Sequence, residues 1–199
     1  GHSAMRVENR QTGEDIAVNY GMFNFDKPFF VLRFVFGLTD YEMGVCPFEA
    51  FKREYMYHGS SVVQQELNLT ASEKLRVLAA LNKNWLPENR VYRYNYFYDN
   101  CTTRVRDIVE SCVDGKVVYG GEVPKGATFR TMIHDMNDDW PWARLGNDML
   151  LGVGADKKLS MSEYQFLPHS MLSSANSAYI IDKHGNKRRF VKRESEVVE

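Results

Sequence analysis

The stretch of sequence that decides the fold spans residues 96–110 and reads Tyr96-Phe97-Tyr98-Asp99-Asn100-Cys101-Thr102-Thr103-Arg104-Val105-Arg106-Asp107-Ile108-Val109-Glu110. Its first part is aromatic and predicts the end of a strand over residues 90–97, whereas its second part has helical periodicity and predicts a helix over residues 101–113. Asp99 and Asn100 are good N-cap residues, so strand and helix should meet there. The expected fold is α+β, with an antiparallel sheet packed with helices.

Cys101 falls in the first turn of the predicted helix. Backbone N–H groups and the positive end of the helix dipole gather there and favour an anion, so the pKa of the thiol should be lowered. The sequence therefore indicates a nucleophilic cysteine. The alternative is a structural cysteine in the core, because free cysteine is among the most buried residue types. The apolar stripe of the helix keeps this alternative open, since it consists of Cys101, Val105, Ile108, Val109 and Cys112.

The remaining elements are predicted from periodicity, proline and capping signals. Strands are expected over residues 2–7, 15–25, 41–45, 61–69, 178–182 and 188–192, the last two as a hairpin. Helices are expected over residues 28–36, 47–57, 70–82, 128–136, 142–151 and 159–163. Thr70 and Glu73 form a capping box at the start of helix 70–82. The apolar stripe of that helix is predicted to be Leu75, Leu78, Ala79 and Leu81.

The composition limits the classes of protein to which the chain can belong. The chain has 199 residues, of which 44% are hydrophobic and 26% charged, which is an ordinary globular balance. We expect a single domain over residues 1–199, with a core in 1–113 and a helical and hairpin part in 114–199. The net charge of −1 argues against a dedicated nucleic-acid-binding protein. The longest apolar stretch, residues 28–38, is too short to span a bilayer.

The cysteines and histidines do not predict a metal site. Cys46, Cys101 and Cys112 are an odd number, so they cannot all pair within the chain. No zinc-binding spacing such as C-x-x-C or H-E-x-x-H occurs in the sequence. We therefore expect no metal and no cofactor.

A thiolate nucleophile needs a base, usually histidine, and a polar group that orients that base. His2 lies in the predicted strand 2–7, where its side chain can face a cleft. The paired strand offers Asn19 and Tyr20 to hold the second imidazole nitrogen, and Asn19 is preferred by analogy with Cys-His-Asn sites. The alternative is that Gly1 and His2 are derived from a cloning vector. Capping, packing or surface roles are expected for the other histidines, which are His58, His134, His169 and His184.

Several segments together resemble the Lnb N-terminal periplasmic domain family. They are residues 2–7, 19–25, 65–70 and 92–104, followed by 142–152 and 166–168. The block Asp99-Asn100-Cys101-Thr102-Thr103 is the most specific of them. The resemblance implies a circularly permuted, NlpC-type papain-like fold, in which the histidine strand precedes the cysteine helix. It also implies that a Gly-His pair opens the domain, so that Gly1 and His2 are native.

The resemblance further implies a lipoprotein N-acyltransferase activity, which moves an acyl chain from a phospholipid to the N-terminal amine of a lipoprotein. Cys101 would form a thioester, His2 would act as the base and Asn19 would hold its tautomer. Phospholipid and lipoprotein are then the expected partners. Members are mostly Bacteroidetes envelope proteins that often carry transmembrane helices after this domain, so we expect a periplasmic location and a tether to the inner membrane in the full-length protein.

Alternatives remain open on substrate and on catalysis. The same cysteine and histidine suit a papain-like peptidase or amidase that acts on cell-wall peptides with water as the acceptor. A non-catalytic envelope module, in which Cys101 is structural, is a third possibility. An acyl groove could be lined by aromatic residues of the predicted helix 28–36, but an ordinary buried helix is the favoured interpretation of that segment. These aromatic residues are Phe29, Phe30, Phe34 and Phe36.

Overall fold

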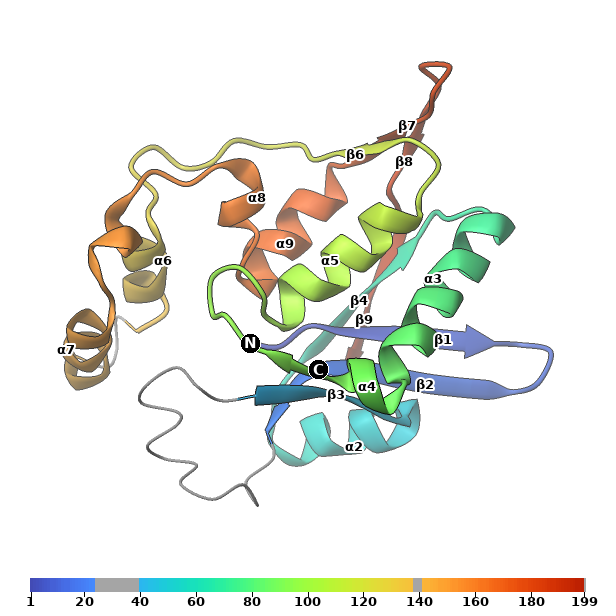
Figure 1. Cartoon of the computed structure of the whole chain (residues 1–199), viewed down its shortest axis with the longest axis horizontal. Coiled ribbons are helices and arrows are strands. Elements are labelled where there is room, and N and C mark those ends of the chain that lie inside the picture. Colours follow the sequence, from blue (N-terminus) through green and yellow to red (C-terminus); the bar gives the residue numbers. More distant parts are fainter. Residues whose placement is uncertain (24–39, 138–140, 199) are drawn as a thin grey trace.

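The computed structural model of the chain describes residues 1–23, 40–137 and 141–198. The predicted helix 28–36, and with it the candidate acyl groove of Phe29, Phe30, Phe34 and Phe36, lies outside the described residues. The described chain is α+β with antiparallel sheets, as predicted (Figure 1). Its strands are β1 (Ala4–Asn9), β2 (Glu14–Phe23), β3 (Asp40–Pro47), β4 (Val62–Leu67), β5 (Val91–Arg93), β6 (Lys116–Val118), β7 (Tyr179–Ile181), β8 (Lys187–Arg189) and β9 (Val191–Val198). Its helices are α2 (Phe48–Tyr57), α3 (Ala71–Trp85), α4 (Pro87–Arg90), α5 (Cys101–Cys112), α6 (Phe129–Asp135), α7 (Pro141–Leu150), the 3-10 helix η1 (Val153–Asp156), α8 (Met161–Tyr164) and α9 (Pro168–Asn176).

The central sheet has the strand order β1-β2-β3-β5, with every neighbouring pair antiparallel. Side chains alternate between the faces of a strand, and β2 shows the consequence. Val18 joins the main core, in which β1 and β2 pack against α3 and α5. Its neighbour Ala17 lies on the opposite face and packs with Phe48 and Phe51 of α2. The sheet therefore lies between α2 and the pair α3 and α5 (Figure 1).

Two smaller sheets join distant parts of the chain. Strand β4 pairs with β9, and β6, β7 and β8 form a sheet with β7 in the middle. The predicted hairpin at the end of the chain is confirmed, because β7 and β8 are antiparallel neighbours. Phe190, which precedes β9, and Val191, the first residue of β9, enter the main core, so the C-terminal part of the chain packs directly on the N-terminal part.

A second apolar cluster holds α6, η1 and α8 together, with Phe129 and Phe166 fully buried in it. Phe97 reaches into this cluster from the segment before α5 and stacks on Phe129, with ring centroids 4.1 Å apart. The buried Arg106 of α5 adds a polar link, because its Nη1 donates to the carbonyl of Ser162 at 2.6 Å. The cluster is thus fastened to the segment that carries Cys101.

Three sequence expectations need correction, and they concern the strand at His2, the apolar stripe of α3 and the strand 90–97. The strand that follows His2 begins at Ala4, so His2 precedes β1 rather than lying within it. The apolar stripe predicted for α3 is wrong in part, because Leu75 is 67% exposed and Leu78 is 40% exposed. Leu81 is buried as predicted, and Val77, which was not predicted, is buried with it.

The predicted strand 90–97 ends at Arg93, because the following residues form a turn. Asn95 and Asp99 pair through two backbone hydrogen bonds of 3.1 and 2.8 Å. The Asn95 side chain also accepts from the N–H groups of Phe97 and Tyr98. The turn carries the aromatic residues away from the sheet and toward the α6–α8 cluster.

Candidate active site

Helix α5 begins at Cys101 because Asn100 caps it. Asn100 Oδ1 accepts from the N–H groups of Thr102 at 2.8 Å and Thr103 at 3.0 Å. Its Nδ2 donates to the carbonyls of Tyr96 and Phe166 at 2.9 and 2.8 Å. Asn100 is 4% exposed, so all of these bonds are shielded from water. The cap fixes the first turn of the helix against two neighbouring segments and thereby fixes Cys101.

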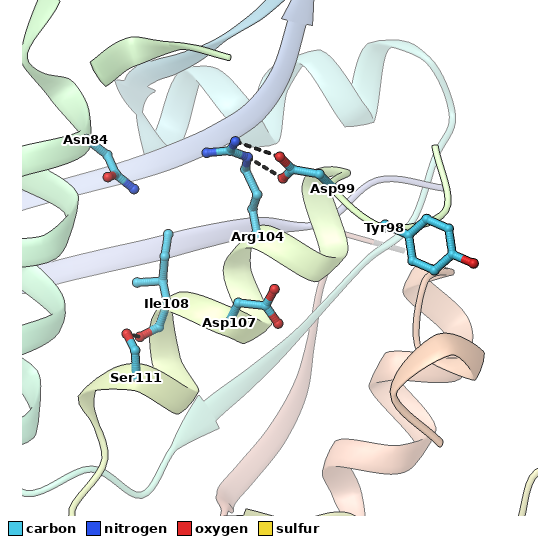
Figure 2. A pocket seen from close by; sticks show the side chains of 7 residues that line it. All are labelled: Asn84, Tyr98, Asp99, Arg104, Asp107, Ile108 and Ser111. Atoms are coloured by element: carbon cyan, nitrogen blue, oxygen red, sulfur yellow. Dashed lines mark hydrogen bonds and ion pairs between the residues drawn. The ribbon is translucent and has the colours of Figure 1, made fainter. Parts of the chain in front are cut away.

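Arg104 holds the same turn from the other side (Figure 2). Its Nη2 donates to Asp99 Oδ2 at 2.8 Å, and its Nε lies beside the second carboxylate oxygen. The guanidinium carbon lies 3.4 Å from the ring centroid of Tyr92 in β5. A paired and stacked guanidinium is geometrically demanding, because its planar group must match both partners. Arg104 therefore ties the residue two before Cys101 to the central sheet.

A bulge in β2 brings the backbone of the sheet against Cys101. The register of β2 on β3 shifts between Asn19 and Met22, and Gly21 within this interval has φ +88°. A Cβ atom on Gly21 would lie 4.0 Å from Cys101 Cβ and 3.6 Å from the ring of Tyr94. Glycine adopts this backbone conformation without the steric cost that other residues carry. The bulge therefore lets β2 approach the nucleophile side of α5 closely.

The structure brings His2, Asn19 and Cys101 together. His2 Nε2 lies 3.1 Å from Asn19 Oδ1, and the His2 side chain is close enough to the Cys101 thiol for each group to shift the pKa of the other. An amide oxygen only accepts, so Nε2 carries the hydrogen and Nδ1 keeps the lone pair of the neutral ring. Asn19 Nδ2 donates in turn to Cys46 Sγ at 3.8 Å, which agrees with this orientation of the amide. Nδ1 is thus the nitrogen able to take a thiol proton.

The charges of the pair support each other. Burial raises the pKa of the Cys101 thiol, but the hydrogen bond and charge of His2, the backbone N–H of Ser3 and the Thr102 hydroxyl outweigh it, and the pKa is lowered. For His2 the effect of burial has the opposite sign and lowers the pKa. Contact with Cys101 and Asn19 outweighs burial, so the pKa of His2 is raised. Both shifts favour a thiolate beside an imidazolium.

Tyr20, the other candidate partner for His2, is directed elsewhere. It is 1% exposed, and its hydroxyl accepts from Asn84 Nδ2 of α3 at 2.9 Å. Of the remaining histidines, His58 forms the C-cap of α2. His134 contacts Asp148 of α7 at 2.7 Å, which is a packing role as expected.

Sequence reasoning missed several residues around the pair. Ser3 and Thr102 hydrogen-bond each other beside Cys101, and Cys46 contacts Asn19. Gly21 had a usable signal, since a glycine inside a strand pattern indicates a bulge or a close backbone approach. For Ser3, Thr102 and Cys46 no pattern in the sequence indicates the pairing, because it depends on how distant segments pack.

A cavity on the far side of Arg104 is separate from the pair. It lies beside α3 and α5, and Cys101, His2 and Asn19 are not among its lining residues (Figure 2). The residues that line it are Asn84, Tyr98, Asp99, Arg104, Asp107, Ile108 and Ser111. Within residues 1–23, 40–137 and 141–198, no group of three or more His, Cys, Asp or Glu side chains could hold a metal ion. In the same part of the chain no helix has the length and apolar character needed to cross a bilayer.

Comparison with known proteins gives one match. A family model described as the Lnb N-terminal periplasmic domain matches residues 1–134 of the 199, a range that contains His2, Asn19 and Cys101. No curated protein and no solved structure matches the chain.

Proposed function

The chain belongs to the Lnb N-terminal periplasmic domain family, and from that premise we propose that it is a cysteine-dependent acyltransferase. Its donor would be a phospholipid, and its acceptor an amine such as the N-terminus of a lipoprotein. The observation that carries the proposal is the contact of Cys101, the first residue of α5, with His2, whose Nε2 is held by Asn19. The family also supports a periplasmic location for this domain.

The first half of the reaction forms a thioester. His2 Nδ1 takes the thiol proton, and the Cys101 sulfur attacks the ester carbonyl carbon of the phospholipid. The backbone N–H of Cys101 is one of the helix-terminal donors that have no partner within α5, and it stabilises the oxyanion together with the helix dipole. The bond from carbon to the glycerol oxygen then breaks, and the His2 imidazolium protonates that oxygen. The products are the Cys101 thioester and a lysophospholipid.

The second half transfers the acyl group. The amine nitrogen of the acceptor attacks the thioester carbonyl, and His2 takes a proton from this nitrogen as the bond forms. The carbon–sulfur bond breaks, the thiolate is restored and the acceptor leaves as an amide. Asn19 accepts from Nε2–H throughout, so that Nδ1 faces the reacting atoms in both halves.

Two further parts of the proposal concern architecture. We propose a permuted, NlpC-type papain-like arrangement, supported by a histidine that precedes the cysteine helix along the chain and meets it in space. We also propose a tether to the inner membrane in the full-length protein, since a phospholipid donor lies in a bilayer.

Trapping the acyl-enzyme tests the proposed function. The protein is incubated with phospholipid vesicles whose acyl chains are isotopically labelled, and peptides are mapped by mass spectrometry. We expect a labelled acyl group on Cys101 that neutral hydroxylamine removes, as it does thioesters. Cys101→Ala should abolish the adduct, whereas Cys112→Ala, at the other end of the same helix, should keep it.

Two outcomes would contradict the acyltransferase. An unmodified Cys101 after incubation with phospholipid, in a protein whose thiol still reacts with iodoacetamide, would exclude phospholipid as the donor. Cleavage of a cell-wall peptide by the protein, lost in Cys101→Ala, would instead support the peptidase or amidase with water as the acceptor.

A further inference from the structure

Two hydroxyl groups form a chain that ends at the proposed nucleophile. Ser3 Oγ lies 3.0 Å from Thr102 Oγ1, and Thr102 Oγ1 lies 3.9 Å from Cys101 Sγ. The two residues follow His2 and Cys101 directly in the sequence. One contact therefore joins the neighbour of the base to the neighbour of the nucleophile, across 99 positions of the chain.

The surroundings determine which hydroxyl donates and which accepts in these two contacts. Thr102 is 1% exposed, so within the protein its hydroxyl has Ser3 Oγ and Cys101 Sγ as partners. A hydroxyl has one hydrogen to donate, and a thiolate only accepts. When Cys101 is ionised, Thr102 must donate to the sulfur and accept from Ser3 if both contacts are to be hydrogen bonds. Each bond then polarises the next in the same sense.

We infer that Thr102 stabilises the Cys101 thiolate by donating a hydrogen bond to it, and that Ser3 is a positioning residue that acts through Thr102. This inference rests on the proposed function, because it assigns roles within the same reactive pair. The contact also holds His2 at a fixed place relative to Cys101, since Ser3 follows the histidine directly in the sequence, and the backbone N–H of Ser3 helps to lower the pKa of the thiol. Ser3 and Thr102, the sequence neighbours of His2 and Cys101, thus both stabilise the thiolate–imidazolium pair.

The ionisable groups that face Cys101 allow a clean test. They are His2 on the N-terminal segment, Tyr55 of α2, and the tyrosines that precede α5, which are Tyr92, Tyr94 and Tyr96. Burial raises the pKa of each of these tyrosines above its ordinary value, so they stay neutral below pH 9. The charge of the Gly1 amino group also acts on His2, and this group is the same in the parent and in every variant. A difference between parent and variant in the titration of Cys101 between pH 5 and 9 therefore reports on the thiol, His2 and their hydrogen-bond donors.

The experiment measures the rate of iodoacetamide alkylation of Cys101 between pH 5 and 9, by peptide mapping. The parent is compared with Thr102→Val, Thr102→Ser and Ser3→Ala, and melting temperatures are recorded to check folding. Thr12→Val is the matched control, since Thr12 lies in the β1–β2 turn at the far end of the hairpin (Figure 1). Thr102→Val keeps the shape of the side chain and removes the donor.

We expect Thr102→Val to be alkylated more slowly than the parent at pH 6, by about ten-fold or more, as a lost hydrogen bond to a charged acceptor implies. Thr102→Ser should restore the rate, Ser3→Ala should give a smaller loss, and Thr12→Val should match the parent. If Thr102→Val does not fold, the loss in Ser3→Ala carries the test.

Three results would overturn the inference. In the first, Thr102→Val and Ser3→Ala have the same pH profile as the parent, and the parent thiol titrates well below the ordinary value. This result would contradict the roles of Thr102 and Ser3 but would not contradict the proposed function. A Thr102→Ser variant as slow as Thr102→Val would assign the effect to the threonine methyl group. A parent Cys101 that titrates near the ordinary thiol pKa of about 8.5 would sink this inference and the proposed function together.

Discussion

Replacement of Glu73 by glutamine should destabilise the fold strongly at neutral pH and much less in acid. Glu73 is fully buried at the start of α3. Its carboxylate pairs with Arg188 of β8 and accepts from the N–H groups of Asp114 and Thr70, both at 2.7 Å. One side chain thereby holds together three segments that are distant in sequence. Glu73→Gln removes the charge that the guanidinium of Arg188 faces.

The magnitude follows from the pKa of this carboxyl. Burial raises the pKa of Glu73, but the hydrogen bonds from Arg188, Asp114 and Thr70 outweigh it and lower the pKa from 4.5 to about 2. At 1.36 kcal/mol per unit, the ionised form stabilises the fold by about 3 kcal/mol. Because the folded pKa is the lower one, this stability is present above pH 4.5 and is lost as pH falls toward 2. About 2 kcal/mol of it is lost by pH 3.

Urea unfolding followed by tryptophan fluorescence at pH 7, 4.5 and 3 measures the effect. We expect Glu73→Gln to lower the free energy of unfolding by about 3 kcal/mol at pH 7 and by about 1 kcal/mol at pH 3. Glu66→Gln is the control, because Glu66 pairs with Lys192 at the surface and should leave stability unchanged within error. A deficit for Glu73→Gln that stays constant from pH 7 to pH 3 would refute the reasoning.

Further predictions concern the reactive pair and its support. Iodoacetamide should label Cys101 faster than Cys46 or Cys112 at pH 7, because the pKa of Cys101 is lowered, that of Cys46 is raised by burial and Cys112 is buried in the core; equal labelling in a peptide map would count against a nucleophile. His2→Ala should slow alkylation of Cys101 at pH 6 by about ten-fold or more, since a charge partner is lost, and an unchanged pH profile would contradict the pair. In cells that depend on the full-length protein, Cys101→Ala and His2→Ala should each abolish N-terminal acylation of lipoproteins, and the double variant should be no worse; mass spectrometry showing intact triacylation in the Cys101→Ala strain would eliminate the mechanism. Arg104→Lys should lower stability by about 1–2 kcal/mol in thermal unfolding, because lysine cannot both pair bidentately and stack, and a parent-like melting temperature would show that this contact contributes little.

Local signals in the sequence were sufficient for the cysteine helix. Asn100 does cap it, and Thr70 and Glu73 do form the predicted capping box of α3. These features were predictable because a cap involves residues within three or four positions of each other. The position of Cys101 in the first turn follows directly from the cap. Its pairing with His2, which lies on a different segment, was proposed from the chemistry of the two residues, and the resemblance to a known family strengthened that proposal.

Features set by tertiary packing were not predictable in the same way. Helix α3 carries leucines on more than one face, so periodicity alone could not decide that Val77 rather than Leu75 is buried against the core. The turn after Arg93 depends on the side chain of Asn95, which competes with strand pairing by accepting two backbone N–H groups. The burial of Glu73 depends on Arg188, which lies 115 residues away. Partners distant in sequence decide the burial of Val77 and Glu73, whereas the turn after Arg93 is decided locally by the side chain of Asn95.

The pairing of β4 with β9 has a consequence for how quickly the chain reaches this structure. Gln65 and Glu194, which are opposite each other in the pair, are separated by 129 positions. A ribosome adds about 5–20 residues per second, so β4 waits on the order of ten seconds for its partner. During that time its backbone donors and acceptors present an open edge to other chains. Closure of the loop between β4 and β9 also costs conformational entropy before any contact offsets it, so folding should be slow. Refolding should therefore succeed best at low protein concentration or with a chaperone, because both keep the open edge of β4 from pairing with other chains.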